Sequence, residues 1–229
     1  MHSLSTGGIL HEEERRRVAA VACELVTTRL VVNTSGNVSV RIGDCIAITP
    51  SAREYRSLEP ADICVVDMSG DAVDSRWLPS SELALHLALY KANAECQAIV
   101  HTHSVHATAV SMLVEALPAI HYQMADLGGA VPVAPYATFG SPELAANVTR
   151  TIPNHTAVLM QNHGSISYGP TLQKALARTV LLEWCAEVWL KAAAVGKPNG
   201  LSEHQLEAAF EQMSSFGRAR DACACGNTH

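Results

Sequence analysis

Histidine residues cluster directly after an apolar run at residues 98–100. His101, His103 and His106 all lie within six positions. Imidazole nitrogens are common ligands of zinc and related divalent metals. Residues two apart on a strand leave it on the same face, about 6.5–7 Å apart, so the rings of His101 and His103 can converge on one ion. His106 falls at the start of the next expected helix, and we place it outside the site.

A third ligand must come from another segment, and His163 has a matching context. It follows the apolar run 158–161 and precedes Gly164. Three imidazoles would form an open site that leaves one coordination position free for substrate. The alternative is that these histidines are hydrogen-bonded polar residues at strand ends. The His-x-His pair, together with a third histidine in the same setting, favours the metal site.

Short strands and helices are expected to position these residues. Strands are predicted at 38–42, 45–49, 63–67, 98–103, 131–134 and 158–161, and helices at 10–30, 81–93, 105–116, from 142, 171–195 and 202–213. Ser80 and Ser81 are expected to cap the second helix, with Glu82 in its first turn. The order of elements is not a strict βαβ winding, which favours an α/β layered fold with a largely antiparallel sheet.

Composition limits the possible partners. The net charge is -6, with 16 basic and 22 acidic residues, which argues against a nucleic-acid surface. No apolar stretch reaches the ~20 residues of a membrane span. Seven cysteines, without the spacing of a disulfide framework, indicate a reducing cytoplasm. We expect one domain over residues 1–229, with flexible tails at 1–9 and 218–229.

Phosphate binding has no glycine-rich signature in this chain, because neither a Walker motif nor G-x-G-x-x-G occurs. Hydroxyls and backbone N–H groups could hold a phosphate instead. Ser80-Ser81 at a helix start and Gly36-Asn37 in a tight turn offer such groups. The same residues also fit plain capping and turn formation, and both interpretations remain open on the residues alone.

Taken together, five short motifs resemble the class II aldolase/adducin family. They occur in family order and are Gly36-Asn37-Val38-Ser39, Thr49-Pro50-Ser51, Ser80-Ser81-Glu82, His101-Thr102-His103-Ser104 and Asn162-His163-Gly164. The resemblance covers residues 10–216. It implies a class II aldolase-like layered fold, with a central mostly antiparallel sheet flanked by helices. It also implies a C4 homotetramer with active sites between subunits.

The resemblance implies a role for each matching residue. His101, His103 and His163 would bind one Zn²⁺ per subunit, and Glu82 would be the catalytic acid/base and also touch the metal. Tyr122 would reach the aldehyde end of a neighbouring subunit's substrate. The phosphate-binding residues would be Gly36, Asn37, Ser51, Ala52, Ser80 and Ser81, and Phe139 would line the aldehyde pocket. Ala52 departs from the glycine usual in the family.

The implied reaction is zinc-dependent retro-aldol cleavage of a ketose 1-phosphate resembling L-fuculose 1-phosphate. The products would be dihydroxyacetone phosphate and a small aldehyde such as L-lactaldehyde. Cleavage through a lysine Schiff base is the other chemical route. The chain has four lysines, and all fall on expected helices or the loop after one, away from the histidines. Alternatives are a sugar-phosphate 4-epimerase or methylthioribulose-phosphate dehydratase of the same family, a non-catalytic adducin-like scaffold, and a structural zinc site.

Overall fold

A nine-stranded sheet forms the centre of the computed structural model, which describes residues 9–225, with side chains described up to residue 216. The strand order is β4 (Ala72–Asp74), β3 (Cys64–Asp67), β2 (Cys45–Ile48), β1 (Asn37–Ile42), β5 (Ala98–Thr102), β9 (Gly164–Gly169), β8 (Ala157–Met160), β7 (Val131–Ala134) and β6 (Ala116–Leu117). Neighbouring strands are antiparallel except for β7 and β8, which are parallel. This confirms the predicted mostly antiparallel sheet.

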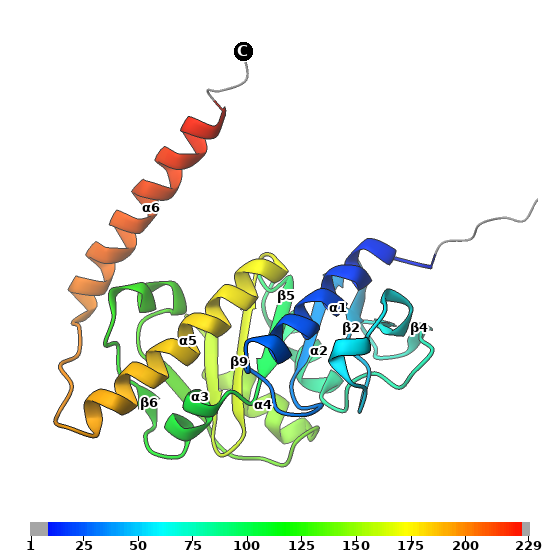
Figure 1. The fold of residues 1–229 in the computed structure, drawn as a ribbon, viewed down its shortest axis with the longest axis horizontal. Coiled ribbons are helices and arrows are strands. Elements are labelled where there is room, and N and C mark those ends of the chain that lie inside the picture. Colours follow the sequence, from blue (N-terminus) through cyan, green and yellow to red (C-terminus); the bar gives the residue numbers. More distant parts are fainter. Residues whose placement is uncertain (1–8, 226–229) are drawn as a thin grey trace, which may run out of the picture.

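Helices cover both faces of the sheet (Figure 1). Two of them, α1 (Glu12–Thr27) and α5 (Leu172–Ala193), pack on one face. On the other face lie α2 (Leu83–Ala92) and α4 (Pro142–Thr151). The short α3 (Val105–Ser111) packs beside α5, and α6 (Glu203–Cys225) projects away from the body. Short 3-10 turns, η1 (Tyr55–Ser57), η2 (Pro60–Asp62) and η3 (Tyr122–Leu127), connect these elements.

The side-chain alternation of β5 determines where the histidines point. This strand is buried along its whole length, between β1 and β9. Ala98 and Val100 belong to the core under α1 and α5, whereas Ile99 belongs to the core under α2 and α4. Because side chains alternate with period two, His101 points to the same side as Ile99. The sheet therefore directs its first histidine toward the layer that contains α2.

Several elements differ from those expected from the sequence. Strand β9 was not predicted, because its sequence Gly-Ser-Ile-Ser-Tyr-Gly has few apolar residues; pairing with β5 and β8 buries it nonetheless. Helix α3 ends at Ser111, where the expected helix continued to 116. The Ser111 hydroxyl accepts a hydrogen bond from the Asn162 backbone N–H, and the chain then turns toward β6.

The C-terminal end of the described chain differs from the predicted flexible tail. The last helix is longer than predicted and runs to Cys225, so residues 218–225, expected as part of a tail, are helical. The remaining tail residues 1–8 and 226–229 lie outside the described residues. One sheet runs through the described chain, and the single domain stays a prediction. Among the described helices, none combines the length and apolar character needed to cross a membrane.

Candidate metal centre

Three histidines meet at the end of β5. The Nε2 atoms of His101 and His103 are 3.0 Å apart, and the His163 ring centroid lies 5.0 Å from that of His101 and 4.8 Å from that of His103. Glu82 completes the cluster, in which the four ligand atoms all lie within 4.8 Å of one another. The His-x-His pair and the Asn-His-Gly motif are thus brought together. His106 instead binds Glu183, with 2.8 Å between Nδ1 and Oε1, so it lies outside the cluster as expected.

Close backbone approach explains the Asn-His-Gly motif. Strand β9 begins at Gly164, beside the end of β5. A Cβ on Gly164 would collide with the Thr102 carbonyl oxygen and lie 3.2 Å from the His103 Cα. Asn162 has a φ of 54°, a left-handed conformation that Asn adopts more readily than most residues. Asn162 and Gly164 therefore hold the turn that places His163 against the β5 histidines.

The hydrogen bond of His101 fixes which nitrogen faces the cluster. Its Nδ1 lies 2.8 Å from the Ser165 carbonyl oxygen, which can only accept, so Nδ1 carries the proton in the neutral ring. Nε2 then directs a lone pair toward His103 and toward Glu82 Oε2, which is 2.9 Å away. Backbone carbonyls orient metal-binding histidines in this way in known metal sites.

Burial and mutual charge set the protonation of the cluster. Burial, together with the neighbouring charge of His101, lowers the pKa of His103 to about 3 and that of His163 to about 4. Burial alone would also lower the pKa of His101, but Glu82 outweighs it and the net shift is upward. Burial raises the pKa of Glu82, but His101, His163 and the Asn37 hydrogen bond outweigh it and lower the pKa. Glu82 is therefore ionised at neutral pH.

This donor set fits a divalent metal. The Glu82 Oε1 atom is buried without a hydrogen-bond partner among the described residues, although an ionised oxygen in such a place is costly unless it is compensated. It lies 3.4 Å from the His163 Nε2 atom. One carboxylate and three imidazoles are ligands that suit Zn²⁺ and similar ions. The residues present could thus hold a metal.

Glu82 begins α2 in a different manner from that expected. It occupies the N-cap position instead of the first turn, and neither of the serines 80 and 81 is the cap residue. The Ser80 hydroxyl accepts a hydrogen bond from the Glu82 backbone N–H at 3.2 Å. The Glu82 carboxylate makes no capping bond and is turned toward the histidines.

The predicted phosphate-binding segments lie next to one another. An isolated bridge joins Pro50 to Pro79, and the backbone N–H of Ser51 donates to the Leu78 carbonyl at 2.9 Å. Gly36 approaches β5 so closely that a Cβ would lie 2.7 Å from the His101 carbonyl oxygen. Glycine is required there, since its φ is +81°. The segments at 36–37, 51–52 and 80–82 thus surround the start of α2, although their role in phosphate binding stays a prediction.

Ala52 has a left-handed backbone, with a φ of 54°. Such a conformation costs an ordinary L-residue about 1–2 kcal/mol, whereas glycine in its place costs about 0.4–1 kcal/mol through the unfolded chain. We therefore expect Ala52→Gly to raise the free energy of unfolding by about 0.5–1 kcal/mol. Urea unfolding measures this change. Ala94→Gly is the matched control, at an exposed alanine without a positive φ, and should lower the same quantity. Equal losses in both variants would contradict strain at Ala52.

The two residues assigned to the aldehyde end lie in different places. Phe139 is largely exposed and precedes Gly140, where a Cβ would lie 2.8 Å from the Ser81 carbonyl oxygen. This packing places the Phe139 loop beside the start of α2. Tyr122 is half exposed in η3, where its ring lies 4.5 Å from that of His121. Within the described chain, η3 packs against α5 and α6.

A chain of four buried polar residues behind Glu82 was not predicted from the sequence. They form a hydrogen-bonded chain from Glu82 into the core, and they are Asn37, Ser39, His86 and Tyr90. Asn37 had been assigned to phosphate alone. The sequence does contain a signal for this chain, because Glu82, His86 and Tyr90 are spaced by four residues and so share one face of a helix.

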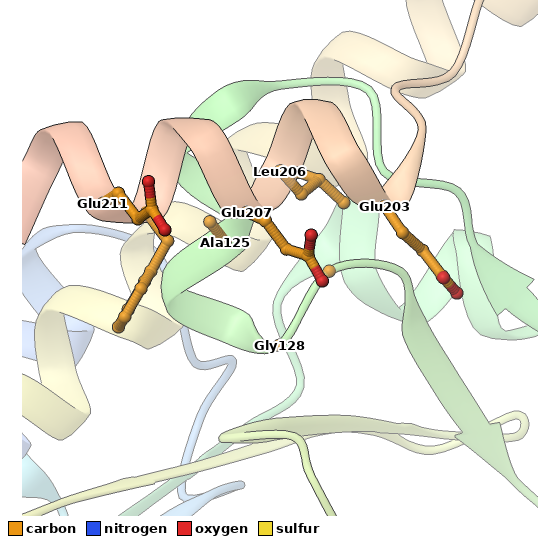
Figure 2. Close-up of a pocket in the computed structure, with 8 residues that line it drawn as sticks. Ala125, Gly128, Glu203, Leu206, Glu207 and Glu211 are labelled. Atoms are coloured by element: carbon orange, nitrogen blue, oxygen red, sulfur yellow. The ribbon is translucent and has the colours of Figure 1, made fainter.

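A hollow lies between α6 and η3, and none of the three histidines lines it (Figure 2). It has a volume of about 540 Å³, and Ala125 and Gly128 line one side. Glu203, Glu207 and Glu211 line the side that α6 provides. Three carboxylates would repel a phosphorylated ligand. The acidic lining makes this hollow a poor phosphate site.

A cluster of three histidines and a carboxylate lies at the end of a central strand of a mostly antiparallel sheet, and known proteins share this combination. Residues 16–190 match the family model described as "Class II Aldolase and Adducin N-terminal domain". The chain belongs to the class II aldolase and adducin family. Class II aldolases are metal-dependent carbon–carbon lyases, and this chain is an enzyme of that class.

Individual relatives are similar over nearly the whole chain. The L-fuculose phosphate aldolase of Escherichia coli strain K12 is 39% identical over 210 residues, which cover 89% of this chain and 97% of the relative. A 5-deoxy-D-ribulose 1-phosphate aldolase of Bacillus thuringiensis serovar kurstaki is 32% identical, covering 92% and 100%. A solved structure of an L-fuculose 1-phosphate aldolase superposes with a TM-score of 0.87 at 34% identity, covering 90% of this chain and 98% of that one.

Proposed function

We propose that the chain cleaves a ketose 1-phosphate similar to L-fuculose 1-phosphate, in a zinc-dependent retro-aldol reaction. The products would be dihydroxyacetone phosphate and a small aldehyde such as L-lactaldehyde. The observation that carries the proposal is the buried Glu82 carboxylate, set among three histidines, with one oxygen that has no hydrogen-bond partner among the described residues. The similarity to L-fuculose phosphate aldolase over 89% of the chain supports the substrate class.

We assign metal binding and proton transfer to different residues of the cluster. His101, His103 and His163 would hold the zinc ion, which when bound supplies a Lewis acid for the substrate carbonyl. Glu82 is ionised, so in the condensation direction it can take a proton from C3 of dihydroxyacetone phosphate. In the cleavage direction a base takes the proton of the C4 hydroxyl and the C3–C4 bond breaks. Glu82, protonated from that base or from solvent, then gives a proton to C3, so the reaction consumes no net proton. Tyr122 is our candidate for the proton at the aldehyde side.

The phosphate would lie over the segments that surround the start of α2. Backbone N–H groups and hydroxyls are suited to bind it, and the proposed residues are Gly36, Asn37, Ser51, Ala52, Ser80 and Ser81. Phe139 would line the aldehyde pocket, which its loop supports by packing against Ser81. Side chains near Phe139 would then meet the carbon chain that distinguishes one substrate from another.

A panel of ketose 1-phosphates tests the proposal. The zinc-loaded protein is incubated with each sugar, and dihydroxyacetone phosphate is detected through an NADH-linked reductase. We expect turnover of L-fuculose 1-phosphate or of a 5-deoxypentulose 1-phosphate, the substrate class named for the Bacillus relative. Isomerised sugar without free aldehyde would indicate a 4-epimerase instead, and loss of water a dehydratase. An inert protein with intact metal would favour the scaffold.

We also propose a homotetramer in the cytoplasm. The tetramer follows from the family resemblance, and the half-exposed side chain of Tyr122 supports it, because it is accessible to a neighbouring subunit. Exposed apolar side chains on α3 and α5, namely Val105, Val180 and Trp184, support an interface on that side. The cytoplasmic location is supported by free cysteines, which are Cys23, Cys45, Cys64, Cys96 and Cys185.

A shared active site predicts complementation between two inactive subunits. We expect Tyr122→Phe and Glu82→Gln proteins to be nearly inactive when each is assembled alone. In randomly mixed tetramers, roughly a quarter of the interfaces would combine an intact Glu82 with an intact Tyr122 from the next subunit. Co-expression with two affinity tags, followed by the aldolase assay, measures the recovered activity.

Protein carrying both substitutions in every chain is the control, since no arrangement of its subunits can restore a site. A site built within one chain would recover nothing, because every chain in the mixture carries one lesion. Mixed tetramers that stay at the level of the separate variants would therefore contradict the shared site.

A further inference from the structure

A chain of buried polar side chains connects Glu82 with the core between β1 and α2. Asn37 and Ser39 lie two residues apart on β1, so both face α2. His86 and Tyr90 follow Glu82 at intervals of four residues and face β1. All four are at most 3% exposed. Polar groups at such depth cost free energy unless they are hydrogen bonded, and here each is bonded to the next.

The hydrogen bond next to Glu82 fixes the orientation of Asn37. The Asn37 Nδ2 atom lies 2.9 Å from Glu82 Oε2. An ionised carboxylate can only accept, so the amide nitrogen must face it and the amide oxygen must face away. That oxygen lies 2.5 Å from His86 Nε2 and can only accept in turn. His86 Nε2 therefore carries a hydrogen and donates it.

The remaining bonds are fixed in the same direction. A neutral imidazole with a hydrogen on Nε2 has a lone pair on Nδ1. The Ser39 hydroxyl, 2.6 Å from Nδ1, must donate to it. Ser39 Oγ then accepts from the Tyr90 hydroxyl at 2.7 Å. Burial lowers the pKa of His86 to about 3, so the ring is neutral as this arrangement requires. Every donor from Tyr90 onward points toward the carboxylate.

Such a chain orients groups and does not conduct protons. A relay needs atoms that accept one proton and release another, as hydroxyls and imidazoles do. The Asn37 amide binds His86 through its oxygen and Glu82 through its nitrogen, so a proton cannot pass across it without rotation of the whole group. The consequence for Glu82 is geometric. Its Oε2 atom is held by Asn37, while Oε1 has no hydrogen-bond partner among the described side chains.

We propose that His86 is a positioning residue, whose Nε2–H, fixed by Ser39 and Tyr90, keeps the Asn37 amide N–H toward Glu82 and so aims the free Glu82 oxygen at the reacting atoms. The inference rests on the proposed function, which assigns proton transfer to Glu82. It adds a second polar layer, between β1 and α2, that determines how the carboxylate is presented.

Substitutions of His86 test the effect on turnover. His86→Phe keeps a ring but removes the N–H, so Asn37 can rotate its oxygen toward Glu82. A hydrogen bond to a charged group is lost, and we expect kcat to fall on the order of ten- to a hundredfold while KM changes little. His86→Gln retains an N–H donor and should recover most of kcat. Zinc content and thermal unfolding are measured for each variant, and zinc should stay at the wild-type level.

Tyrosine variants provide a matched pair. Tyr90→Phe removes the hydroxyl at the far end of the chain and should lower kcat by a smaller factor than His86→Phe. Tyr168→Phe removes a hydroxyl of the same sheet that accepts a bond from Asn93 at 2.7 Å. Among the described residues, Tyr168 makes no hydrogen bond with any member of the chain from Tyr90 to Glu82, so its variant should leave kcat unchanged.

NMR spectroscopy tests the hydrogen-bonded chain independently of catalytic turnover. Protein labelled with ¹⁵N-histidine reports the tautomer of each ring through two-bond ¹H–¹⁵N correlations, and the His86 signals are those missing in His86→Gln. We expect a neutral Nε2–H ring throughout pH 5–8. Ser39→Ala removes the donor to Nδ1 and should populate the Nδ1–H tautomer. This smaller substitution also supplies a kcat value if His86→Phe does not fold.

The outcomes separate the two proposals. If the wild-type protein cleaves no ketose 1-phosphate, the proposed function fails, while the tautomer of His86 still tests the hydrogen-bond chain. A wild-type His86 that is charged or carries its hydrogen on Nδ1 would overturn the inference. A folded His86→Phe protein with wild-type kcat would overturn it as well.

Discussion

His103→Ala is expected to lose both bound zinc and aldolase activity. The His103 ring lies 4.8 Å from the rings of both His101 and His163, and the pKa of about 3 keeps its nitrogen free to bind a metal at neutral pH. Removing one of three imidazoles leaves an incomplete ligand set for an ion that prefers four ligands. Metal analysis after dialysis, together with the aldolase assay, measures the effect. We expect zinc far below one ion per chain and activity reduced by roughly 10² or more.

His106→Ala is the matched control, three residues further along the chain. His106 binds Glu183 and lies outside the cluster, so this variant should keep its zinc. Thermal unfolding of both proteins separates loss of metal from loss of fold. Stoichiometric zinc and full activity in His103→Ala would show that the ligands are misassigned.

Glu82→Gln is expected to abolish most turnover while leaving the fold intact. The amide has the same shape as the carboxylate and can still accept the hydrogen bond from Asn37, but it cannot take up and return a proton. Activity should therefore fall by roughly 10² or more, while most of the zinc affinity of the three histidines is kept. Single-turnover assays and zinc titration measure the two effects separately.

Glu183→Gln is the control for this second substitution, since Glu183 is a partly buried carboxylate that binds His106 outside the cluster. Near-normal turnover in Glu82→Gln would remove Glu82 from the mechanism. A protein that loses zinc and activity together would instead show that Glu82 acts mainly as a ligand.

Local spacing was enough to predict that the three histidines come together, whereas Glu82 was assigned to the cluster through the family resemblance. The His-x-His pair on one strand face and the matching histidine before Gly164 are short-range patterns, and the structure brings them together. Longer-range pairing was not predictable in this way. Strand β9 is defined by its partners β5 and β8 more than by its own apolar content, and the buried chain through His86 needs β1 beside α2. The sequence distance of 49 residues between His86 and Asn37 hides that contact from any local pattern.

The pairing of β5 on both edges limits how the candidate metal site can be altered. His101 is opposite Asn37 on β1 and Ile166 on β9. A shift of one residue would turn the histidine to the other face, and a shift of two would move it by about 6.5–7 Å. A change of strand register can therefore move His101 only in steps of one residue and cannot make a small adjustment of its position. Adaptation to a longer or shorter aldehyde must come from segments outside the sheet, such as the exposed loop at Phe139. Laboratory evolution toward a new sugar would gain most by varying that loop while leaving the strands untouched.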